Sequence, residues 1–465
     1  MIPSRPPYPE PRIPPTLQRV LGRSPATMTL GLTNIERLLH RLGDPHHGLR
    51  TAVVAGTNGK GSVTAMLASI LRESGLRVGR FISPHVYSVT ERIAIDDHPV
   101  SIEELDEAAT SVAALERDLE FSYFEALVAM ACLLFARHGV DVVVFEVGLG
   151  GRLDATNVTA PDVAVITSIS LDHRRLLGDT MAEILLEKYG VARTGTPLLV
   201  GPLDTSLEDS LVARARRDGV PVELFSGLGE VRVEGGGDGM IRRTEFGRNV
   251  RICTPRADYG LVRVPFSGYH QAANALLAVA ASERLLSGEP VPVHAIEQSY
   301  LPARFEPFDL EGRRVILDVA HNDAALRAVA RSLMRVSSRD NSTVVFGLMK
   351  RKELFDAPRA LLDAARRVIT IQADAGSTGA FRGAAYSAAE LHARFIHPQL
   401  TDRRVDAIVW NHGGADGWNR LVEYLAETTP VGGTILAAGS HHVAAGIGRA
   451  LWSSGAVPAS AAALV

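Results

Sequence analysis

A glycine-rich segment at Gly56–Ser62 constrains the fold of this chain more than any other feature. It follows an apolar, β-branched run at Thr51–Ala55 and precedes a helical pattern of apolar residues between positions 63 and 71. Backbone N–H groups in a strand–loop–helix turn, together with the positive end of the helix dipole, form a cradle for phosphate. The Lys60 amine can reach the β- and γ-phosphates of a nucleotide, and the Ser62 hydroxyl can bind Mg²⁺.

The segment differs from the usual P-loop, because Gly61 separates the lysine from the hydroxyl and Val54 replaces the first glycine. A short glycine loop can also be a simple turn, but its context and its lysine favour phosphate binding. We therefore predict that ATP is bound by Thr57, Asn58, Gly59, Lys60, Gly61 and Ser62.

Strand and helix patterns alternate after this loop. Continuous apolar runs at Val78–Ile82, Asp141–Val147 and Val163–Ile169 are typical of strands buried on both faces of a parallel sheet. A helical pattern at Phe124–Arg137 lies between the runs at Val78–Ile82 and Asp141–Val147. This alternation predicts an α/β domain with a parallel sheet.

The second half of the chain predicts a second, smaller α/β domain. Residues 228–266 contain turn glycines and short β-prone pieces, so we expect a small antiparallel excursion before a helix at His270–Leu286. Glycine and prolines cluster near residues 288–303, which indicates a domain boundary. The alternation then restarts with strands expected at Val315–Val319, Thr343–Phe346, Val368–Ile371, Ala407–Trp410 and Thr434–Ala438.

These patterns divide the chain into four predicted parts. Residues 1–25 are expected to be a disordered proline-rich extension, and residues 26–297 an ATP-binding domain. Residues 298–455 form the predicted C-terminal α/β domain, and residues 456–465 a flexible tail. The prolines near the N-terminus interrupt any apolar stretch of the kind that a signal peptide needs.

Composition excludes several classes of partner. The net charge of −3 gives no basic surface for nucleic acid or an anionic membrane. No apolar run approaches the roughly 18 residues that span a bilayer. The two cysteines, Cys132 and Cys253, have no metal-ligand spacing. We therefore expect a cytoplasmic, monomeric protein that binds small molecules.

Lysine is rare in this chain compared with arginine, so each lysine position is a candidate for a role that arginine cannot fill. The 49 basic residues include four lysines, and 49 minus 4 leaves 45 arginines. An arginine-rich genome explains the bias, but a lysine amine can lose its proton and react, whereas a guanidinium stays charged. Lys60 and Lys188 are therefore candidates for chemistry, although a solvated position on the outer face of a helix at Met181–Ala192 is the alternative for Lys188.

The Gly-Lys-Gly-Ser form of the loop is accompanied by a series of further motifs, in order over residues 28–330. They are Leu32–Arg37, Ser83-Pro84-His85, Glu91-Arg92-Ile93, Ser122–Glu125, Glu146–Asn157, Thr167-Ser168-Ile169, Asp172-His173, Leu177-Gly178, Glu187-Lys188, Gly268–Gln271 and Asn274-Ala275. This ordered series resembles the folylpolyglutamate synthase and dihydrofolate synthase family of the Mur ligase superfamily.

The resemblance implies an N-terminal P-loop ATPase domain of the Mur ligase central-domain type and a smaller Rossmann-like C-terminal domain. It implies catalytic roles for Lys60, His173 and Lys188, with Lys188 carbamylated. It places Mg²⁺ on Ser62, Ser83, Glu146, His173 and Lys188. It assigns ATP also to His270, Asn274, Arg304, Asp318 and His321, and the acid substrate to Pro84, His85, Phe124, Glu125, Arg152 and Asp154.

Physical chemistry agrees with part of this set. Glu146 ends a predicted buried strand, where open α/β sheets place ligands, and a carboxylate is a hard oxygen ligand that suits Mg²⁺. A strand-end carboxylate in an ion pair is the alternative. His173 rests on the resemblance, because imidazole is a less usual partner for Mg²⁺, and a histidine near a helix start is also a common capping residue.

The second domain departs from the family pattern. Ala303 stands where the family has glycine, Asp323 where it has proline, and Lys350-Arg351-Lys352 where it has Asp-Lys-Asp. Gly439-Ser440-His441-His442 replaces the family's Ser-Leu-Tyr stretch. These changes fall on the side that receives the incoming amino acid in the family, so they bear on that substrate and not on the nucleotide chemistry.

Taken together, the sequence predicts an ATP-dependent ligase that joins L-glutamate to a folate-type carboxylate through an acyl-phosphate. The expected cofactors are ATP and Mg²⁺, with K⁺ as a further candidate. Two other hypotheses of function remain. A specialised paralogue could join another acid to an amino acid, and a nucleotide-binding protein without ligase activity is the third possibility, which the presence of Lys60, Glu146, His173 and Lys188 disfavours.

Overall fold

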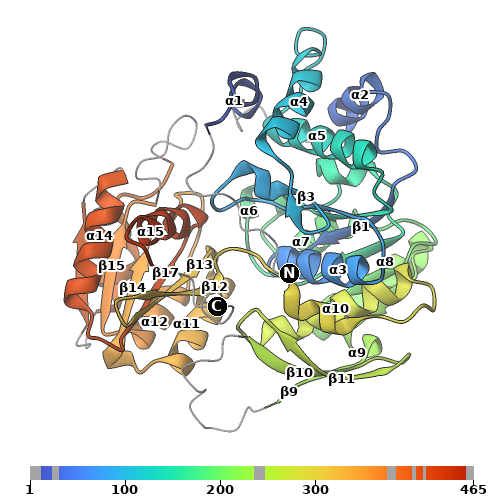
Figure 1. The fold of residues 1–465 in the computed structure, drawn as a ribbon. Coiled ribbons are helices and arrows are strands. Elements are labelled where there is room, and N and C mark those ends of the chain that lie inside the picture. Colours follow the sequence, from blue (N-terminus) through green and yellow to red (C-terminus); the bar gives the residue numbers. More distant parts are fainter. Residues whose placement is uncertain are drawn as a thin grey trace. The chain divides into compact units, whose positions relative to one another are not determined.

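The computed structural model describes residues 12–22, 31–234, 247–373, 384–400, 405–411 and 415–456 (Figure 1). The chain divides into two compact units, and the main division falls between Leu301 and Pro302, inside the segment where the sequence predicts a boundary, with Phe266–Gly268 also assigned to the second unit. Within the described ranges, no helix has the length and apolar character that crossing a membrane requires. The predicted tail beyond residue 456 and the first eleven residues lie outside the described ranges.

The first unit is built on an eight-stranded sheet in the order β4-β3-β2-β5-β1-β6-β7-β8. All neighbours from β2 to β8 pair in parallel, whereas β3 and β4 form an antiparallel edge. This confirms the predicted parallel α/β domain. The strands are β1 (Arg50–Ala55), β2 (Val78–Phe81), β3 (Ile93–Ile95), β4 (His98–Pro99), β5 (Val142–Glu146), β6 (Val163–Ile166), β7 (Leu198–Val200) and β8 (Val222–Leu224).

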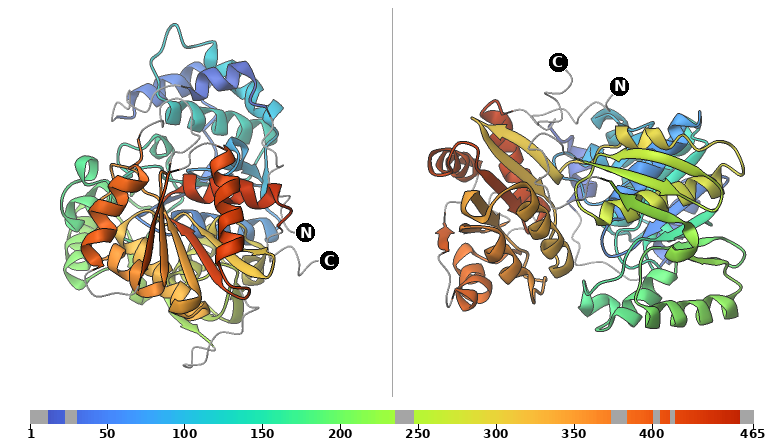
Figure 2. Two further views of the ribbon diagram at one scale, coloured as in Figure 1. Left: turned by 90° about the vertical axis from the view of Figure 1, so that its left-hand side faces the viewer. Right: turned by 90° about the horizontal axis from the view of Figure 1, so that it is seen from below.

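Helices cover both faces of this sheet (Figure 1). α3 (Lys60–Glu73) packs against α10 (His270–Leu285) on one face, and α5 (Tyr123–His138) lies on the other. The predicted antiparallel excursion is a three-stranded sheet that contacts α10, and its strands are β9 (Glu230–Val233), β10 (Arg248–Cys253) and β11 (Asp258–Val264). The right panel of Figure 2 shows that small sheet beside α10.

The remaining helices of the unit are shorter or peripheral. They are α1 (Pro15–Leu21), α2 (Thr33–Arg41), α4 (Ile102–Ala113), α6 (Arg174–Leu177), α7 (Met181–Tyr189), α8 (Thr205–Asp218) and α9 (Phe225–Leu228), with 3-10 turns η2 (Val89–Arg92), η3 (Ala155–Val158) and η4 (Val293–Gln298).

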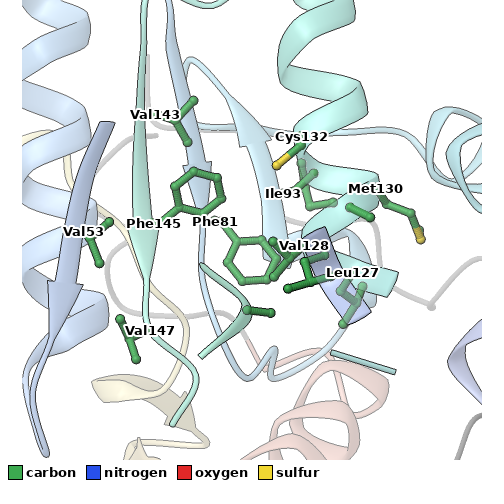
Figure 3. Close-up of a cluster of buried hydrophobic side chains, with 14 of the residues drawn as sticks. Val53, Phe81, Ile93, Leu127, Val128, Met130, Cys132, Val143, Phe145 and Val147 are labelled. Carbon is green, nitrogen blue, oxygen red and sulfur yellow. The ribbon is translucent and has the colours of Figure 1, made fainter. Parts of the chain in front are cut away.

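The core between the sheet and α5 is aromatic at its centre (Figure 3). The rings of Phe81 on β2 and Phe145 on β5 lie 6.0 Å apart between centroids, and both side chains are fully buried. α5 is held at its start by a capping box between Ser122 and Glu125. Helix and strands are therefore fixed together directly beneath the loops that follow β2 and β5.

One part of the predicted disordered extension is wrong. Residues 15–21 form α1, which starts with proline at its first position, where a missing N–H costs nothing. Leu17 and Val20 are fully buried, α1 packs against α4, and the Leu17 N–H donates to Asp106 Oδ1 over 3.0 Å. The surrounding prolines concealed this helix, because Leu17, Val20 and Leu21 extend the apolar helical pattern over little more than one turn.

The second unit has a six-stranded sheet in the order β12-β13-β17-β14-β15-β16, with β12 antiparallel and the others parallel. Its strands are β12 (Arg304–Leu310), β13 (Arg313–Asp318), β14 (Ser342–Phe346), β15 (Arg367–Ile371), β16 (Asp406–Trp410) and β17 (Thr434–Ala438). Its helices are α11 (Asp323–Val336), α12 (Ala357–Ala364), α13 (Ala388–Leu391), α14 (Ala415–Thr428) and α15 (His441–Ser453), with short turns η5 (Arg339–Asn341), η7 (His392–Ile396) and η8 (His397–Gln399).

All five strands predicted for the second unit are present, and β12 is an additional one. Pro307 within it argues against a strand in the sequence, yet an edge strand tolerates proline because one side needs no partner. The left panel of Figure 2 shows the parallel strands of this unit with their helices.

Candidate active site

The glycine loop is where the sequence predicts it, between β1 and α3, and two of its glycines cannot be replaced without a clash. Gly56 has a φ of 147°, and a Cβ there would lie 1.9 Å from Thr167 Oγ1. Gly59 has a φ of 90°, and a Cβ there would lie 2.6 Å from Asn274 Oδ1. Both the left-handed backbone and the close neighbours therefore require glycine.

The loop is braced by the segment that follows β6. The Thr57 N–H donates to the Ser168 carbonyl over 2.8 Å, and the Asn58 N–H donates to Ser168 Oγ over 3.0 Å. The Thr167 hydroxyl donates to the Asn58 carbonyl over 2.6 Å, and the Asn58 side-chain amide reaches Ser170 Oγ at 3.2 Å. The Thr-Ser-Ile motif thus acts by holding the shape of the glycine loop.

Two lysine amines meet on one carbonyl oxygen of the loop. Lys60 Nζ donates to the Gly56 carbonyl over 3.1 Å and to the Thr57 carbonyl over 3.2 Å. Lys188 Nζ, which comes from α7, donates to the same Gly56 oxygen over 2.8 Å. The sequence separation between Lys188 and Gly56 is 132 residues, so the fold alone brings these amines together.

Burial changes the state of the Lys188 amine. The side chain is only 4% exposed, and burial lowers its pKa from 10.5 to about 7, helped by the charge of Lys60 and opposed by those of Asp172 and Asp154. Near neutral pH a large share of this amine is therefore uncharged and nucleophilic. The solvated, outward-facing alternative for Lys188 is excluded by this burial.

Glu146 ends β5 beside the glycine loop. Its side chain is 3% exposed, its backbone is in register with Val54 of β1, and its Oε2 accepts a hydrogen bond of 3.0 Å from the Ser83 N–H. Ser62, in the first turn of α3, is also 3% exposed. The buried Glu146 carboxylate, with Ser83 as its hydrogen-bond partner, and the Ser62 hydroxyl are hard oxygen donors of the kind that Mg²⁺ prefers.

His173 occupies a special backbone position at the start of α6. Its φ is 51°, its N–H donates to Asp172 Oδ1 over 2.8 Å, and its side chain is 42% exposed. The Asp172 carboxylate is only 8% exposed. The sequence named Asp172 within a motif without giving it a role, and the structure shows it to be a buried charge acting on Lys188.

Arg92 links two of the segments that are expected to contact the acid. The Ser83–Pro84 peptide bond is cis, and His85 Nδ1 accepts a hydrogen bond of 2.8 Å from Arg92 Nε. The Arg92 guanidinium lies 5.5 Å from the centre of the Tyr123 ring. Arg92 is 6% exposed, and its place in a motif was the only signal that pointed to it.

Glu91 is another residue whose role the sequence did not predict, after Asp172 and Arg92. Its buried carboxylate accepts hydrogen bonds of 2.7–2.8 Å from the N–H groups of Val86, Tyr87 and Ser88. Burial raises its pKa, and these three amides oppose that rise. Glu91 therefore shapes the turn that carries His85.

Phe124 and Glu125 lie at the start of α5. The Phe124 ring faces Gly148, where a Cβ would come within 2.5 Å of the ring. Glu125 is 5% exposed, and its Oε2 accepts a 2.7 Å hydrogen bond from the Ser122 N–H. The motifs after β5 and before α5 therefore pack on each other.

Arg152 and Asp154 have structural partners. The Asp154 carboxylate accepts from the Leu149 N–H over 2.8 Å and from the Thr156 N–H and hydroxyl over 3.0 and 2.6 Å, and burial raises its pKa. Arg152 pairs with Glu187 Oε1 at 2.8 Å, next to Lys188. These contacts hold the 148–156 loop, and a role in substrate binding stays a prediction for both residues.

α10 supplies the predicted nucleotide residues His270 and Asn274. Asn274 is 5% exposed, and its side-chain N–H donates to Gln271 Oε1 over 2.9 Å. Its amide oxygen faces Gly59, so α10 meets the loop directly. His270 lies in the first turn of the helix with its side chain exposed.

In the second unit, Arg304 and Asp318 lie opposite each other on β12 and β13. Asp318 accepts hydrogen bonds from the Phe305 and Ala320 N–H groups over 2.9 and 2.7 Å. Burial raises the pKa of Asp318, and the charge of Arg304 opposes that rise. His321 follows, with Nδ1 3.0 Å from the Val319 carbonyl. The structure thus brings these three predicted nucleotide residues to one end of the β12–β13 pair.

The departures from the family pattern have local explanations. Ala303 keeps a left-handed φ of 52°, the conformation for which the family's glycine is suited. Asp323 Oδ1 accepts 2.8 Å hydrogen bonds from both the Phe355 and the Ala357 N–H groups. Lys350 lies in a turn with Nζ 3.9 Å from Glu390 Oε2. Gly439–His442 forms the entry to α15, where Ser440 caps the helix by accepting from the His442 N–H.

A glycine loop with its helix, two amines on one loop carbonyl and a buried carboxylate on the adjacent parallel strand define a nucleotide-binding α/β enzyme. The comparisons with known proteins refine this class. The sequence matches the Mur ligase middle domain over residues 54–282 and the glutamate ligase domain of Mur ligases over residues 303–441.

Individual relatives agree with these domains. The dihydrofolate synthase/folylpolyglutamate synthase of Bacillus subtilis is 34% identical over 346 residues, which cover 71% of this chain and 78% of that protein. A probable bifunctional folylpolyglutamate synthase/dihydropteroate synthase of Haloferax volcanii is 35% identical over 351 residues, but this chain spans only 41% of its length. The Mycobacterium tuberculosis folylpolyglutamate synthase solved with ADP and AMPPCP has 30% identity and a TM-score of 0.76, covering 91% of this chain and 95% of that chain.

The chain therefore belongs to the folylpolyglutamate synthase and dihydrofolate synthase family of Mur ligases, which are ATP-dependent ligases. FolC of E. coli, solved with DHPP and ADP, is also similar in structure, with a TM-score of 0.77, 26% identity and coverage of 94% and 97% of the two chains. Both the fold class and the family expected from the sequence are confirmed.

Proposed function

We propose that this chain joins L-glutamate to a folate-type carboxylic acid, using ATP to form an acyl-phosphate. The observation that carries the proposal is the meeting of Lys60 and Lys188 on the Gly56 carbonyl, beside the strand that ends at Glu146. The Lys60 ammonium can turn from this carbonyl to a phosphate oxygen in the same cradle, whereas the Lys188 amine, with its pKa lowered to about 7, is available to react with CO₂. The solved relatives that carry ADP support this assignment.

The nucleotide is assigned to the glycine loop and to the start of α3. Thr57, Asn58, Gly59 and Gly61 offer backbone N–H groups, while Lys60 supplies charge to the β- and γ-phosphates. Asn274 and His270 would contact the nucleotide from α10, and Arg304, Asp318 and His321 would do so from the second unit.

We propose Ser62, Ser83, Glu146, His173 and a carbamylated Lys188 as the ligands of Mg²⁺. When bound, Mg²⁺ neutralises charge that develops on the transferred phosphate. Carbamylation is the attack of the neutral Lys188 amine on CO₂, which forms an N–C bond and releases one proton. A pKa of about 7 makes the attacking amine available at neutral pH, and burial keeps it from the solvent.

The chemistry has two steps. An oxygen of the substrate carboxylate attacks the γ-phosphorus of ATP, and the bond to the β-phosphate oxygen breaks to release ADP. The amine of L-glutamate then attacks the acyl carbon, inorganic phosphate leaves, and the amine loses a proton. Lys60 stabilises charge in the first step, while the acid is positioned by Pro84, His85, Phe124 and Glu125, with Arg152 and Asp154 supporting the adjoining loop.

The test is direct. Purified protein is incubated with ATP, Mg²⁺ and L-glutamate, with either dihydropteroate or tetrahydrofolate as the acid, in the presence and absence of K⁺. We expect a product heavier by one glutamate residue, formed with release of one phosphate per bond. ATP cleavage with neither acid, accompanied by cleavage with a different acid, would overturn the folate assignment.

A second candidate is a paralogue with the same chemistry and another amine or acid. The observation that favours it is the altered second unit, where Asp323 holds the 355–357 backbone and Lys350–Lys352 forms a basic turn. Charge complementarity still favours an anionic amine such as L-glutamate. A mass-spectrometric screen of acid and amino-acid pairs separates the two candidates, because the paralogue would form its adduct from a pair other than L-glutamate and a folate-type acid.

A further inference from the structure

The turn that joins α2 to β1 gathers three metal-ligating side chains. Asp44, His46 and His47 place one potential ligand atom each within 4.8 Å of the others. The turn is closed by the His47 N–H, which donates to the Asp44 carbonyl over 3.0 Å, and Pro45 occupies its second position. Proline at that place fixes the backbone, so the three side chains are held together by the turn itself.

Two further features separate this cluster from a solvated polar turn. His46 is half-buried, and its Nδ1 is buried with no hydrogen-bond partner among the described residues. Asp44 has a left-handed φ of 54°, and its carboxylate lies 3.1 Å from His40 Nδ1, in the last turn of α2. A buried imidazole nitrogen without a partner is costly unless something binds it.

We infer that Asp44, His46 and His47 form a binding site for a divalent transition-metal ion of the Zn²⁺ type. Two imidazoles and a carboxylate are ligands that Zn²⁺ prefers, whereas Mg²⁺ favours oxygen atoms alone. Ligand atoms around tetrahedral Zn²⁺ lie about 3.3 Å apart, given bonds of about 2.0–2.1 Å, so rotation of the exposed His47 side chain would close the site. His40 would orient the Asp44 carboxylate from outside the ligand set.

This site is distinct from the proposed Mg²⁺ site. The turn precedes β1 at Arg50, whereas the glycine loop follows β1 at Gly56, so the two lie at opposite ends of one strand. Six residues of strand span roughly 20 Å. An ion at the turn would tie the end of α2 to the start of β1 without entering the nucleotide site.

The experiment measures Zn²⁺ affinity of the whole chain by competition with a chromophoric chelator. The variants are His46→Gln, His47→Gln and the double variant, and His98→Gln is the matched control, because His98 is an exposed histidine of the same unit outside the cluster. We expect submicromolar binding by the wild type and by the control. Each single variant should bind at least about 10-fold more weakly, since loss of even an outer-shell partner costs 10–100-fold.

A second measurement identifies the location. Anomalous diffraction at the zinc edge from crystals grown with Zn²⁺ should give a peak among Asp44, His46 and His47, and the double variant should lose it. Because the site is remote from the nucleotide loop, the double variant should keep Mg²⁺-dependent ATP turnover. Wild-type Zn²⁺ affinity in the double variant, a peak only at other residues, or binding no tighter than micromolar would each overturn the proposal.

Discussion

The two units use the same architecture, yet their functional loops hold their charged groups in opposite ways. In the first unit, the Lys60 and Lys188 amines donate to the carbonyls of the glycine loop. In the second, Asp318 and Asp323 each accept hydrogen bonds from two backbone N–H groups. One loop is lined by lysine amines, and the other is built around buried carboxylates.

The difference determines which groups can act on a ligand. A lysine that moves from a carbonyl to a phosphate exchanges one acceptor for a stronger one, and the Gly56 carbonyl can keep the other amine. A carboxylate that leaves two backbone N–H groups exposes both without a partner, at a cost of about 1–3 kcal/mol each. Lys60 and Lys188 are therefore suited to chemistry, whereas Asp323 is committed to the shape of its loop.

The largest expected effect tests the cationic loop. Lys60→Ala removes the charge that faces the β- and γ-phosphates, so ATP turnover should fall at least about 100-fold, as when one preorganised donor is lost. Lys350→Ala, in a turn of the second unit, is the matched control and should keep ADP affinity. Steady-state phosphate release and ADP titration measure both. Near-normal turnover by Lys60→Ala would refute the phosphate-loop assignment.

Lys188→Arg tests whether charge or reactivity matters in the same loop. Arginine keeps the positive charge but cannot become a carbamate, so activity should fall at least about 100-fold. Intact-mass measurement of the wild type under gentle conditions with bicarbonate should show the added CO₂. An arginine variant that is active would show that the amine serves only as a cation.

Asp323→Pro restores the residue that the family has, and it tests how much the two backbone hydrogen bonds to the Asp323 carboxylate contribute to stability. Proline fits, because position 323 is the first of α11 and Asn322 before it is extended, with a ψ of 168°. The Phe355 and Ala357 N–H groups lose their acceptor, so stability should fall by roughly 2–3 kcal/mol. Urea unfolding gives the free energy of unfolding, and hydrogen exchange at these two amides should accelerate.

The control for this variant is Asp356→Ala, in the same loop. The Asp356 side chain is 78% exposed and lies 3.8 Å from Arg327, so its removal should change stability by less than about 0.5 kcal/mol. Equal losses in the two variants would show that the carboxylate of Asp323 contributes charge and not backbone anchoring.

Lys188→Met should make the protein more stable while abolishing activity. Burial of the amine costs free energy, and the Gly56 carbonyl still accepts from Lys60, so methionine should stabilise by roughly 1–2 kcal/mol at pH 7. The folded pKa of about 7 lies below the unfolded value of 10.5, so the unfolded state binds more protons between these values. Wild-type stability should therefore rise with pH relative to the variant.

Thermal unfolding in CO₂-depleted buffer checks the sign. The advantage of Lys188→Met should shrink between about pH 7 and about pH 9. An advantage that grows with pH, or a destabilised variant at pH 7, would contradict a neutral buried amine.

The sequence predicted the loop and the parallel strands because their signals are local. Gly56–Ser62 needs only its neighbours to indicate a strand–loop–helix turn, and continuous apolar runs indicate buried strands. Contacts between distant segments could not be read in this way. Nothing near Lys188 indicates that its amine reaches Gly56, and nothing near Asp323 indicates its hold on the 355–357 backbone. The short α1 and the proline-containing β12 were missed because local propensity argues against both.

The smallest expected effect concerns Ala303, where the second unit has lost a family glycine but kept its backbone. The left-handed φ of 52° costs alanine about 1 kcal/mol. Glycine would relieve this strain and so stabilise the folded state. Two effects oppose that gain, because glycine raises the entropy of the unfolded chain and removes a buried methyl group that contributes about 0.8 kcal/mol. Ala303→Gly should therefore change stability by less than about 1 kcal/mol and leave ATP turnover unchanged.

Ala303→Val, which adds a β-branched side chain at the same φ, should cost at least about 2 kcal/mol, because strain and overpacking then add. If chemical denaturation shows valine to be as well tolerated as glycine, the backbone at position 303 is not held in the left-handed region, and the loop leading to Arg304 has a different shape from that of the family.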